Sequence, residues 1–250
     1  MGFKNSLESH EHSRQILDLL YTYDSFLDSL KVIADFGCGT GIDVNWWATL
    51  MTRDDPPEPR NYLVYGVDKD LSRIDDSVKA LENVKLIEGD FEQDHVIPRA
   101  CDLIWCHDAF QYSTTPLQTL SNWNHQLNQD GMLVLSIQQP VYYQYNRLQH
   151  TSHDGIFYNH NIASIMYMLA VNGFDCRDAY FLKEPNSPWL YTATYKTCEP
   201  LDPKTTTWAS LAELGLVGES AINSYNKHSF VKEEDLLTLW LDKAFRWPGE

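Results

Sequence analysis

Three glycines follow a short apolar run early in the chain and raise the first question about its chemistry. In the stretch VIADFGCGTGIDVNWW, Gly37, Gly39 and Gly41 alternate with other residues, and Asp35 precedes the first of them by two positions. A strand, a glycine turn and a helix in this order place backbone N–H groups beside a bound ligand. The spacing therefore predicts a ligand-binding loop, although such glycines also occur in turns that bind nothing.

Two common nucleotide-binding motifs do not fit this loop. A dinucleotide fingerprint needs the pattern GxGxxG, and Ile42 occupies the place of its third glycine. A phosphate-binding P-loop needs a Gly-Lys-Ser/Thr triplet, and none follows Gly41. The register is GxGxG, which argues against a pyrophosphate ligand and leaves a nicotinamide dehydrogenase as a distant alternative.

Polar residues also close the later apolar runs. Asp68 ends YLVYGVD, Asp90 ends VKLIEGD, and His107 and Asp108 end the run that begins at Cys101. In open α/β sheets the ligand lies outside the carboxyl ends of the strands, at the point where the strand order reverses. The glycine loop follows the first of these strands, so this edge of the sheet is the predicted place of its ligand.

The elements that must position these residues alternate in type up to Pro140. Strands are predicted at 31–37, 62–68, 84–90, 101–110 and 132–140. Helices are predicted at 13–30, 42–51, 72–83 and 116–131, the last ending in a left-handed cap at Gly131. Nearly continuous apolar strands that alternate with helices predict a parallel sheet covered on both faces. The acidic, proline-rich stretch TRDDPPEPRN is expected to be a loop.

Beyond Pro140 the pattern changes. A helix is predicted over 162–174, closed by Gly173, followed by a pair of strands at 175–184 and 189–197. Two further helical stretches follow at 207–218 and 232–245. We expect one domain over residues 1–198, with a substrate-side insertion at about 140–162, and a helical extension over 199–250 packed on it.

Charge and composition narrow the function classes. The 250-residue chain carries a formal net charge of −16, and its Lys and Arg residues are scattered. Phosphate backbones are bound by clustered cations, so nucleic acid is not an expected partner. The five cysteines form no CxxC pair, which indicates a reducing compartment and argues against a disulfide framework or a zinc site.

The N-terminal stretch MGFKNSLESHEHSRQ is polar, without the apolar core of a signal peptide. No apolar run reaches the roughly 18 to 20 residues that a membrane span needs. The expectation is a cytoplasmic protein without a membrane partner.

The glycine loop resembles motif I of the class I S-adenosylmethionine-dependent methyltransferases, an acidic residue followed by GxGxG. The matching positions are Asp35, Gly37, Cys38, Gly39, Thr40 and Gly41. The resemblance implies S-adenosylmethionine as cofactor, S-adenosylhomocysteine as product, and a doubly wound, mostly parallel seven-stranded sheet with helices on both faces. It also implies that Asp35 faces the cationic end of the cofactor.

The resemblance extends over about the first 140 residues and favours the small-molecule, type 11-like branch. It implies that Asp68 accepts hydrogen bonds from both ribose hydroxyls, with Lys69 beside it, and that Asp90 accepts from the adenine amino group. Phe91 would donate its backbone N–H, and His107 would lie at the methyl end of the cofactor. Asp102 opens its strand and is expected to be structural.

Methyl transfer from a sulfonium requires mainly positioning and, for some acceptors, a base. His107 and Asp108 are the candidate catalytic residues, because an imidazole titrates near physiological pH. For His107, cofactor contact or simple packing is the competing interpretation. Gln138 and Gln139, after the fifth strand, are candidates for orienting a substrate.

The aromatic segment after Pro140 coincides with the place where this family inserts its substrate-recognition element. Candidate pocket residues are Tyr142, Tyr143, Tyr145, Phe157 and Tyr158, together with Trp189 and Tyr191 in the last strand pair. The alternative is that these side chains only cover core under a long loop.

No metal is expected, because SIQQP lacks the Asp-Asn pair of magnesium-dependent relatives. Methylation of nucleic-acid amines is not expected either, because CHDAF lacks the Pro-Pro signature of that branch. The main hypothesis is transfer of a methyl group to oxygen or nitrogen of a small molecule. The alternatives are a protein methyltransferase and a catalytically silent cofactor-binding subunit. The silent subunit would use an apolar stripe of Leu236, Leu237, Leu239, Trp240 and Phe245 for a partner. A homo-oligomer also stays open.

Overall fold

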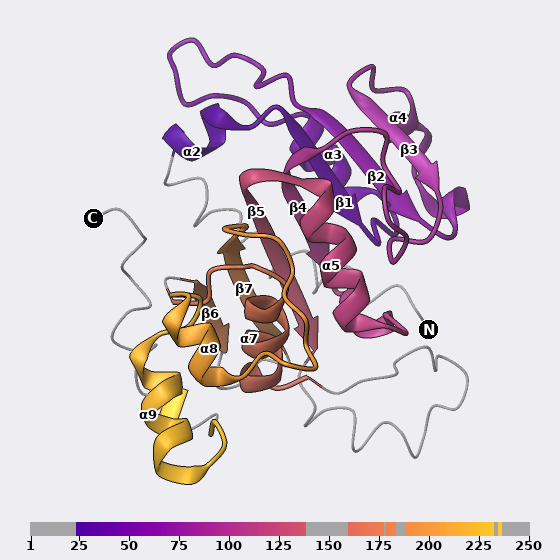
Figure 1. The fold of residues 1–250 in the computed structure, drawn as a ribbon. Helices are drawn as coiled ribbons and strands as arrows, with labels where there is room; N and C mark the ends of the chain where they lie inside the picture. The colour runs from indigo at the N-terminus through magenta and orange to yellow at the C-terminus, as the bar shows by residue number, and fades with distance from the viewer. Residues whose placement is uncertain (1–23, 139–159, 178, 184–188, 233–234, 237–250) are drawn as a thin grey trace.

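The computed structural model describes residues 24–138, 160–177, 179–183, 189–232 and 235–236 (Figure 1). Its centre is one seven-stranded sheet in the order β3-β2-β1-β4-β5-β7-β6. The strands are β1 (Val32–Phe36), β2 (Leu63–Asp68), β3 (Val84–Glu88), β4 (Cys101–His107), β5 (Leu127–Gln138), β6 (Tyr180–Lys183) and β7 (Trp189–Tyr195). The first five strands pair in parallel, and β7 is antiparallel to both β5 and β6. This confirms the predicted doubly wound, mostly parallel sheet.

Helices cover both faces of the sheet. They are α2 (Asp24–Ser29), α3 (Ile42–Ala48), α4 (Asp76–Lys79), α5 (Pro116–Gln126), α7 (Ile162–Val171), α8 (Trp208–Glu213) and α9 (Glu219–His228). Two short 3-10 turns, η1 (Leu71–Arg73) and η2 (Phe110–Tyr112), lie in connections. The strand order reverses between β1 and β4, so the loops after these two strands form the switch point where α/β proteins bind ligands.

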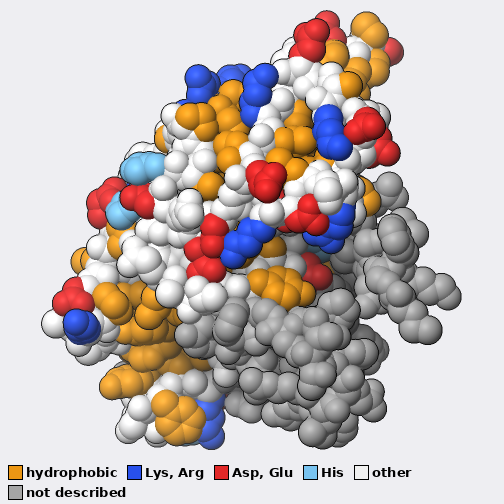
Figure 2. All heavy atoms as spheres, turned by 90° about the vertical axis from the view of Figure 1, so that its right-hand side faces the viewer, with side chains coloured by type: hydrophobic (Ala, Val, Ile, Leu, Met, Phe, Trp, Pro, Cys, Tyr) orange, Lys and Arg blue, Asp and Glu red, His pale blue; other side chains and the backbone are white. Residues whose placement is uncertain are grey.

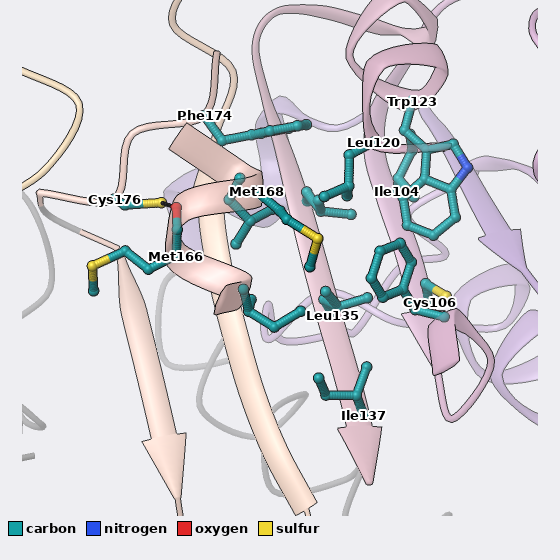
Figure 3. Close-up of a cluster of buried hydrophobic side chains, with 14 of the residues drawn as sticks. Ile104, Cys106, Leu120, Trp123, Leu135, Ile137, Met166, Met168, Phe174 and Cys176 are labelled. Atoms are coloured by element: carbon teal, nitrogen blue, oxygen red, sulfur yellow. Dashed lines mark hydrogen bonds between the residues drawn. The ribbon is translucent and has the colours of Figure 1, made fainter. Parts of the chain in front are cut away.

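The central strands are apolar throughout because both of their faces are buried. Along β4, Ile104 and Cys106 face one cluster of buried side chains, whereas Leu103 and Trp105 face the other. Figure 3 shows the first cluster, in which side chains of β4 and β5 meet those of α5, including Trp123, and of the α7 region. The second cluster packs the sheet against α3. Below, the two sides are called the α5 face and the α3 face.

The predicted helix over 72–83 is wrong in detail. The chain instead forms the 3-10 turn η1 and the four-residue helix α4, with Ile74 in extended backbone between them. Asp70 accepts a hydrogen bond from the Ser72 N–H, and Asp75 accepts one from the Ser77 N–H. Each aspartate thus caps a separate turn, because short acidic side chains compete for the backbone donors of a continuous helix.

The end of the next predicted helix also needs correction. Helix α5 stops at Gln126, and β5 begins at the following residue. Gly131 does not cap a helix, and the left-handed residue in this turn is Asp130 with φ 61°. Gly131 is required for another reason, since a Cβ there would lie 2.8 Å from the Asn128 carbonyl oxygen.

The second half of the described chain agrees with most of the predicted elements. Gly173 ends α7 with φ 79°, and β6 and β7 pair as expected. Helix α9 was not predicted, because its sequence ESAINSYNKH has few apolar residues. The Tyr167 hydroxyl on α7 donates to the Thr206 carbonyl oxygen, so residues after 198 pack on the sheet domain. The domain boundary at 198 itself stays a prediction.

In the part of the chain that the structure describes, no helix has both the length and the apolar character to cross a membrane. On the face drawn in Figure 2, acidic and basic side chains lie interspersed with apolar ones. The predicted helix at 13–30 is described only over α2, and the stripe around Trp240 lies outside the described residues except for Leu236.

Candidate cofactor and active site

Glycine is needed at different positions of the loop for different structural reasons. All adopt positive φ, with 78° at Gly37, 55° at Gly39 and 78° at Gly41. A Cβ on Gly37 would lie 2.2 Å from the Ala109 Cβ, so the β1 loop can pack on the β4 loop only with glycine. A Cβ on Gly39 would have no neighbour closer than 4.0 Å. The backbone at Gly39 is therefore bare and open to a ligand.

The two residues between the glycines offer mainly their backbone. The Cys38 side chain is buried, and its burial, with Asp35 and Asp68 nearby, raises the pKa of the thiol far above its ordinary value. The thiol therefore stays protonated and packs as an apolar group. Thr40 is half-buried at the tip of the same turn.

Asp35 is the most unusual polar group in this part of the molecule. Its side chain is 2% exposed at the end of β1, and Oδ2 accepts no hydrogen bond. Burial, followed by the carboxylates of Asp43 and Asp68, raises the pKa of Asp35 well above its ordinary value. A buried carboxylate without a donor is costly, and a bound cation would remove that cost.

Asp68 holds the glycine loop in place. Its Oδ2 accepts a hydrogen bond from the Gly39 N–H at 2.8 Å, and its Oδ1 accepts one from the Asp70 N–H at 3.0 Å. A carboxylate has about four acceptor positions, so both oxygens keep room for a further donor. The geometry thus places the predicted ribose-binding carboxylate directly against the open loop.

Lys69, Asp90 and Phe91 gather at the ends of β2 and β3. The Lys69 Nζ lies 2.9 Å from Asp90 Oδ2. Asp90 Oδ1 accepts from the Glu92 N–H at 3.1 Å. The Phe91 side chain is buried, and its carbonyl oxygen accepts from the Trp123 indole at 2.8 Å. The structure therefore brings these predicted cofactor residues together beside the β1 loop.

His107 ends β4 on the α3 face, and its nearest charged neighbour was not predicted. The imidazole is 8% exposed, and its Nδ1 lies 3.9 Å from Asp43 Oδ2. The same Asp43 oxygen accepts a hydrogen bond from the Trp105 indole at 3.0 Å. Asp43 stands in the first turn of α3, two residues after Gly41, and this position next to the loop was the only sequence signal for it.

Asp108 has a strained backbone, with φ 52°. Its N–H donates to the Ser136 carbonyl oxygen at 2.9 Å, which ties the β4 loop to β5. Its carboxylate accepts a hydrogen bond from the Gln111 side-chain amide. Asp108 therefore shapes the loop after β4, and its side chain is already engaged within that loop.

A second unpredicted residue, Glu92, joins the β3 loop to the loop that precedes α5. Its carboxylate accepts hydrogen bonds from the N–H groups of Thr114 and Thr115 and from the hydroxyl of Ser113. Partial burial raises the pKa of Glu92, but these donors outweigh it and lower the pKa below its ordinary value. No sequence motif pointed to this residue.

Asp102 lies at the opposite end of the sheet, as expected of a structural residue. Its carboxylate accepts hydrogen bonds from the Lys31 and Val32 N–H groups and from the Asn128 amide. It thereby joins the beginnings of β1 and β5.

Most predicted substrate residues fall outside the described ranges. They are Gln139, Tyr142, Tyr143, Tyr145, Phe157 and Tyr158. Trp189 opens β7, where it pairs with Gln138 at the carboxyl end of β5. Among the described residues, no group of three His, Cys, Asp or Glu side chains is arranged to hold a metal ion, and all five cysteines are free.

The fold is an α/β domain with an open glycine loop at the switch point between β1 and β4, where such folds bind their ligands. Residues 34–135 match the family described as methyltransferase domain. Malonyl-[acyl-carrier protein] O-methyltransferase 2 of Coxiella burnetii is 34% identical over 107 residues, which is 43% of this chain and 41% of the relative. The matched part thus spans less than half of that relative.

Solved structures show the same fold at low sequence identity. Magnesium protoporphyrin IX methyltransferase from Synechocystis PCC 6803 with bound SAH has a TM-score of 0.54 at 18% identity, over 76% of this chain and 84% of that chain. The 1,6-didemethyltoxoflavin-N1-methyltransferase of Burkholderia thailandensis has a TM-score of 0.51 at 14% identity, over 78% and 86%. The expected family resemblance is confirmed over residues 34–135, where the chain matches the methyltransferase domain family, and the solved structures share its fold.

Proposed function

We propose that the protein transfers the methyl group of S-adenosylmethionine to an oxygen or nitrogen atom of a small molecule. The observation that carries the proposal is the buried Asp35 carboxylate, which lacks a donor at Oδ2 and lies beside an open glycine loop. The cofactor is cationic at its sulfonium and amino groups, so it matches this need for positive charge. The Coxiella relative, named as an O-methyltransferase, supports oxygen as one acceptor atom.

The residues present fit the cofactor from one end to the other. Asp35 would hold the cationic amino acid part, and the backbone of Gly37, Cys38, Gly39, Thr40 and Gly41 would line the path toward the ribose. Asp68 would accept from the ribose hydroxyls. Asp90, kept in place by Lys69, would accept from the adenine amino group, and Phe91 would donate its N–H.

When bound, the cofactor supplies a methyl group on a sulfonium, which is already a good leaving group. The protein then has to align the acceptor and take up a proton. His107 is the candidate base, and Asp43 beside its Nδ1 would orient the ring. Asp108 would keep the β4 loop in shape through its bonds to Ser136 and Gln111.

Calorimetric titration with S-adenosylmethionine, S-adenosylhomocysteine and NADH tests the assignment. We expect micromolar binding of the first two and no heat from NADH. Asp68→Ala should weaken binding at least tenfold, about 1.4 kcal/mol, through loss of charged hydrogen bonds. The matched control is Asp76→Ala, because the Asp76 side chain is 96% exposed on α4.

Transfer of a labelled methyl group from the cofactor to added acceptors then tests catalysis directly. If neither S-adenosylmethionine nor S-adenosylhomocysteine binds, the assignment fails. If Asp76→Ala weakens binding as much as Asp68→Ala, the placement of the ribose is wrong.

A further inference from the structure

A buried hydroxyl at the carboxyl end of β5 has no hydrogen-bond partner. The Ser136 side chain is 2% exposed, and its Oγ makes no hydrogen bond. Buried hydroxyls in proteins are almost always paired, because an unpaired one loses its hydration without compensation. The unpaired hydroxyl of Ser136 therefore requires an explanation.

The strand register places this hydroxyl next to the candidate base. Ser136 pairs with His107 on β4 and with Tyr191 on β7, so the three residues lie level across the sheet. Along β5, Val134 belongs to the cluster on the α3 face, and Ser136, two residues further, shares that face. This is also the face that carries His107 and Asp43.

A second unpaired acceptor lies on the other side of Asp108. Gln111 is 1% exposed, and its amide nitrogen donates to Asp108 while its Oε1 accepts nothing. The Asp108 N–H in turn donates to the Ser136 carbonyl oxygen. One short network thus connects two buried residues, Ser136 and Gln111, that each keep an oxygen free.

We propose that Ser136 and Gln111 bind the methyl acceptor and select one that presents an uncharged O–H or N–H group. Gln111 Oε1 can only accept a hydrogen bond, so it needs a donor on the ligand, and the Ser136 hydroxyl oxygen can accept from the same kind of group. The loops at 37–41 and 108–115 contain neither Lys nor Arg, whereas Asp35, Asp43 and Asp108 surround this end of the sheet. An acceptor carboxylate would meet repulsion from these residues. The inference rests on the proposed methyltransferase function.

The test uses the full-length protein saturated with S-adenosylhomocysteine and three ring compounds of similar size: phenol, aniline and benzoate. Binding is followed by ligand-observed nuclear magnetic resonance. Phenol or aniline should bind at least about tenfold more tightly than benzoate. Ser136→Ala should weaken the preferred donor about tenfold, the effect of one buried hydrogen bond, while S-adenosylhomocysteine affinity stays within about twofold.

Thr192→Val is the matched control. The Thr192 hydroxyl is also buried and unpaired, but Thr192 pairs with Phe181 on the α5 face, away from His107. This variant should leave probe binding unchanged. Ser136→Ala should also leave the thermal midpoint unchanged or higher, since it removes an unpaired buried hydroxyl.

Three results would overturn the inference while leaving the proposed function intact. They are tighter binding of benzoate, no binding of either donor probe, or equal effects of Ser136→Ala and Thr192→Val. Loss of S-adenosylhomocysteine binding in the unaltered protein is a different result, because it rejects the proposed function itself.

Discussion

Two carboxylates near the cofactor loops have opposite environments. Asp35, after β1, is buried with one oxygen that accepts no hydrogen bond, and its pKa is raised. Glu92, after β3, accepts hydrogen bonds from Ser113, Thr114 and Thr115, and its pKa is lowered. The protein leaves Asp35 Oδ2 without a hydrogen-bond donor, whereas it supplies several donors to the Glu92 carboxylate.

The difference distinguishes a carboxylate that is available to a ligand from one that stabilises the surrounding loops. A carboxylate whose acceptor positions are filled by the protein has little left for a ligand, so Glu92 stabilises the loops that frame the site. A carboxylate kept unpaired against a desolvation cost needs another partner, and functional sites commonly contain such groups. From this contrast we propose that Asp35 contacts the ligand and that Glu92 supports the scaffold.

The largest expected effect is the loss of cofactor affinity when Asp35 is replaced. Asp35→Asn should lower the affinity for S-adenosylmethionine about 100-fold, roughly 3 kcal/mol, because a buried charge pair is lost. Stability should not fall, since the amide removes a buried negative charge. Calorimetry and thermal unfolding of the same preparation measure the two effects. A large loss of stability with unchanged affinity would reverse the assignment.

The next largest effect is a difference in stability loss between substitutions at Gly37 and Gly39 of the same loop. Gly37→Ala should lower the free energy of unfolding by about 3 kcal/mol, from positive-φ strain and the clash with Ala109. Gly39→Ala should cost only about 1 kcal/mol, because the space there is open, yet it should weaken cofactor binding. Urea unfolding and calorimetry compare them. Equal stability losses in the two variants would contradict the packing argument.

A smaller effect is expected at Glu92. Glu92→Ala should lower the free energy of unfolding by about 2 kcal/mol, because Ser113, Thr114 and Thr115 each lose a charged hydrogen-bond acceptor. The thermal midpoint should fall by about 5 °C. At a temperature where the variant is folded, cofactor affinity should stay within about threefold. A loss of affinity without a loss of stability would move Glu92 into the binding site.

The smallest expected effect is a difference in how the stability contributions of Asp35 and Glu92 change with pH. Glu92, with a lowered pKa, contributes stability that is present above its ordinary value of about 4 and lost as the pH falls through its folded value. Asp35, with a raised pKa, contributes stability below about 4 that is lost as the pH rises through its folded value. Asp35→Asn should therefore gain relative stability from pH 4 to pH 7, whereas Glu92→Gln should lose it. Urea unfolding at both pH values gives the two signs.

Much of the sheet could be predicted because each strand carries its own signal. The apolar runs that became β1, β2 and β4 are buried on both faces, so their composition did not depend on knowing their neighbours. The helix predicted over 72–83 failed because Asp70 and Asp75 offered competing caps. Helix α9 was missed because its apolar residues are few.

Residues of the candidate site could be predicted only where they belong to a sequence motif. Asp35, Asp68 and Asp90 stand at strand ends and match a family pattern, and the structure gathers them around the open loop. Asp43 and Glu92 act through residues that are distant in the sequence, and no local pattern marks such partners.

The sequence by itself determined the alternation of strands and helices, the glycine loop and the acidic strand ends, because these depend on composition and short spacing. Only the tertiary structure decided which polar groups are satisfied. Whether Asp35, Glu92 or Ser136 finds a partner depends on strands and loops that are brought together across long stretches of chain. Hydrogen bonding and burial are properties of that assembly, and they separate the residues that support the site from those left available to a ligand.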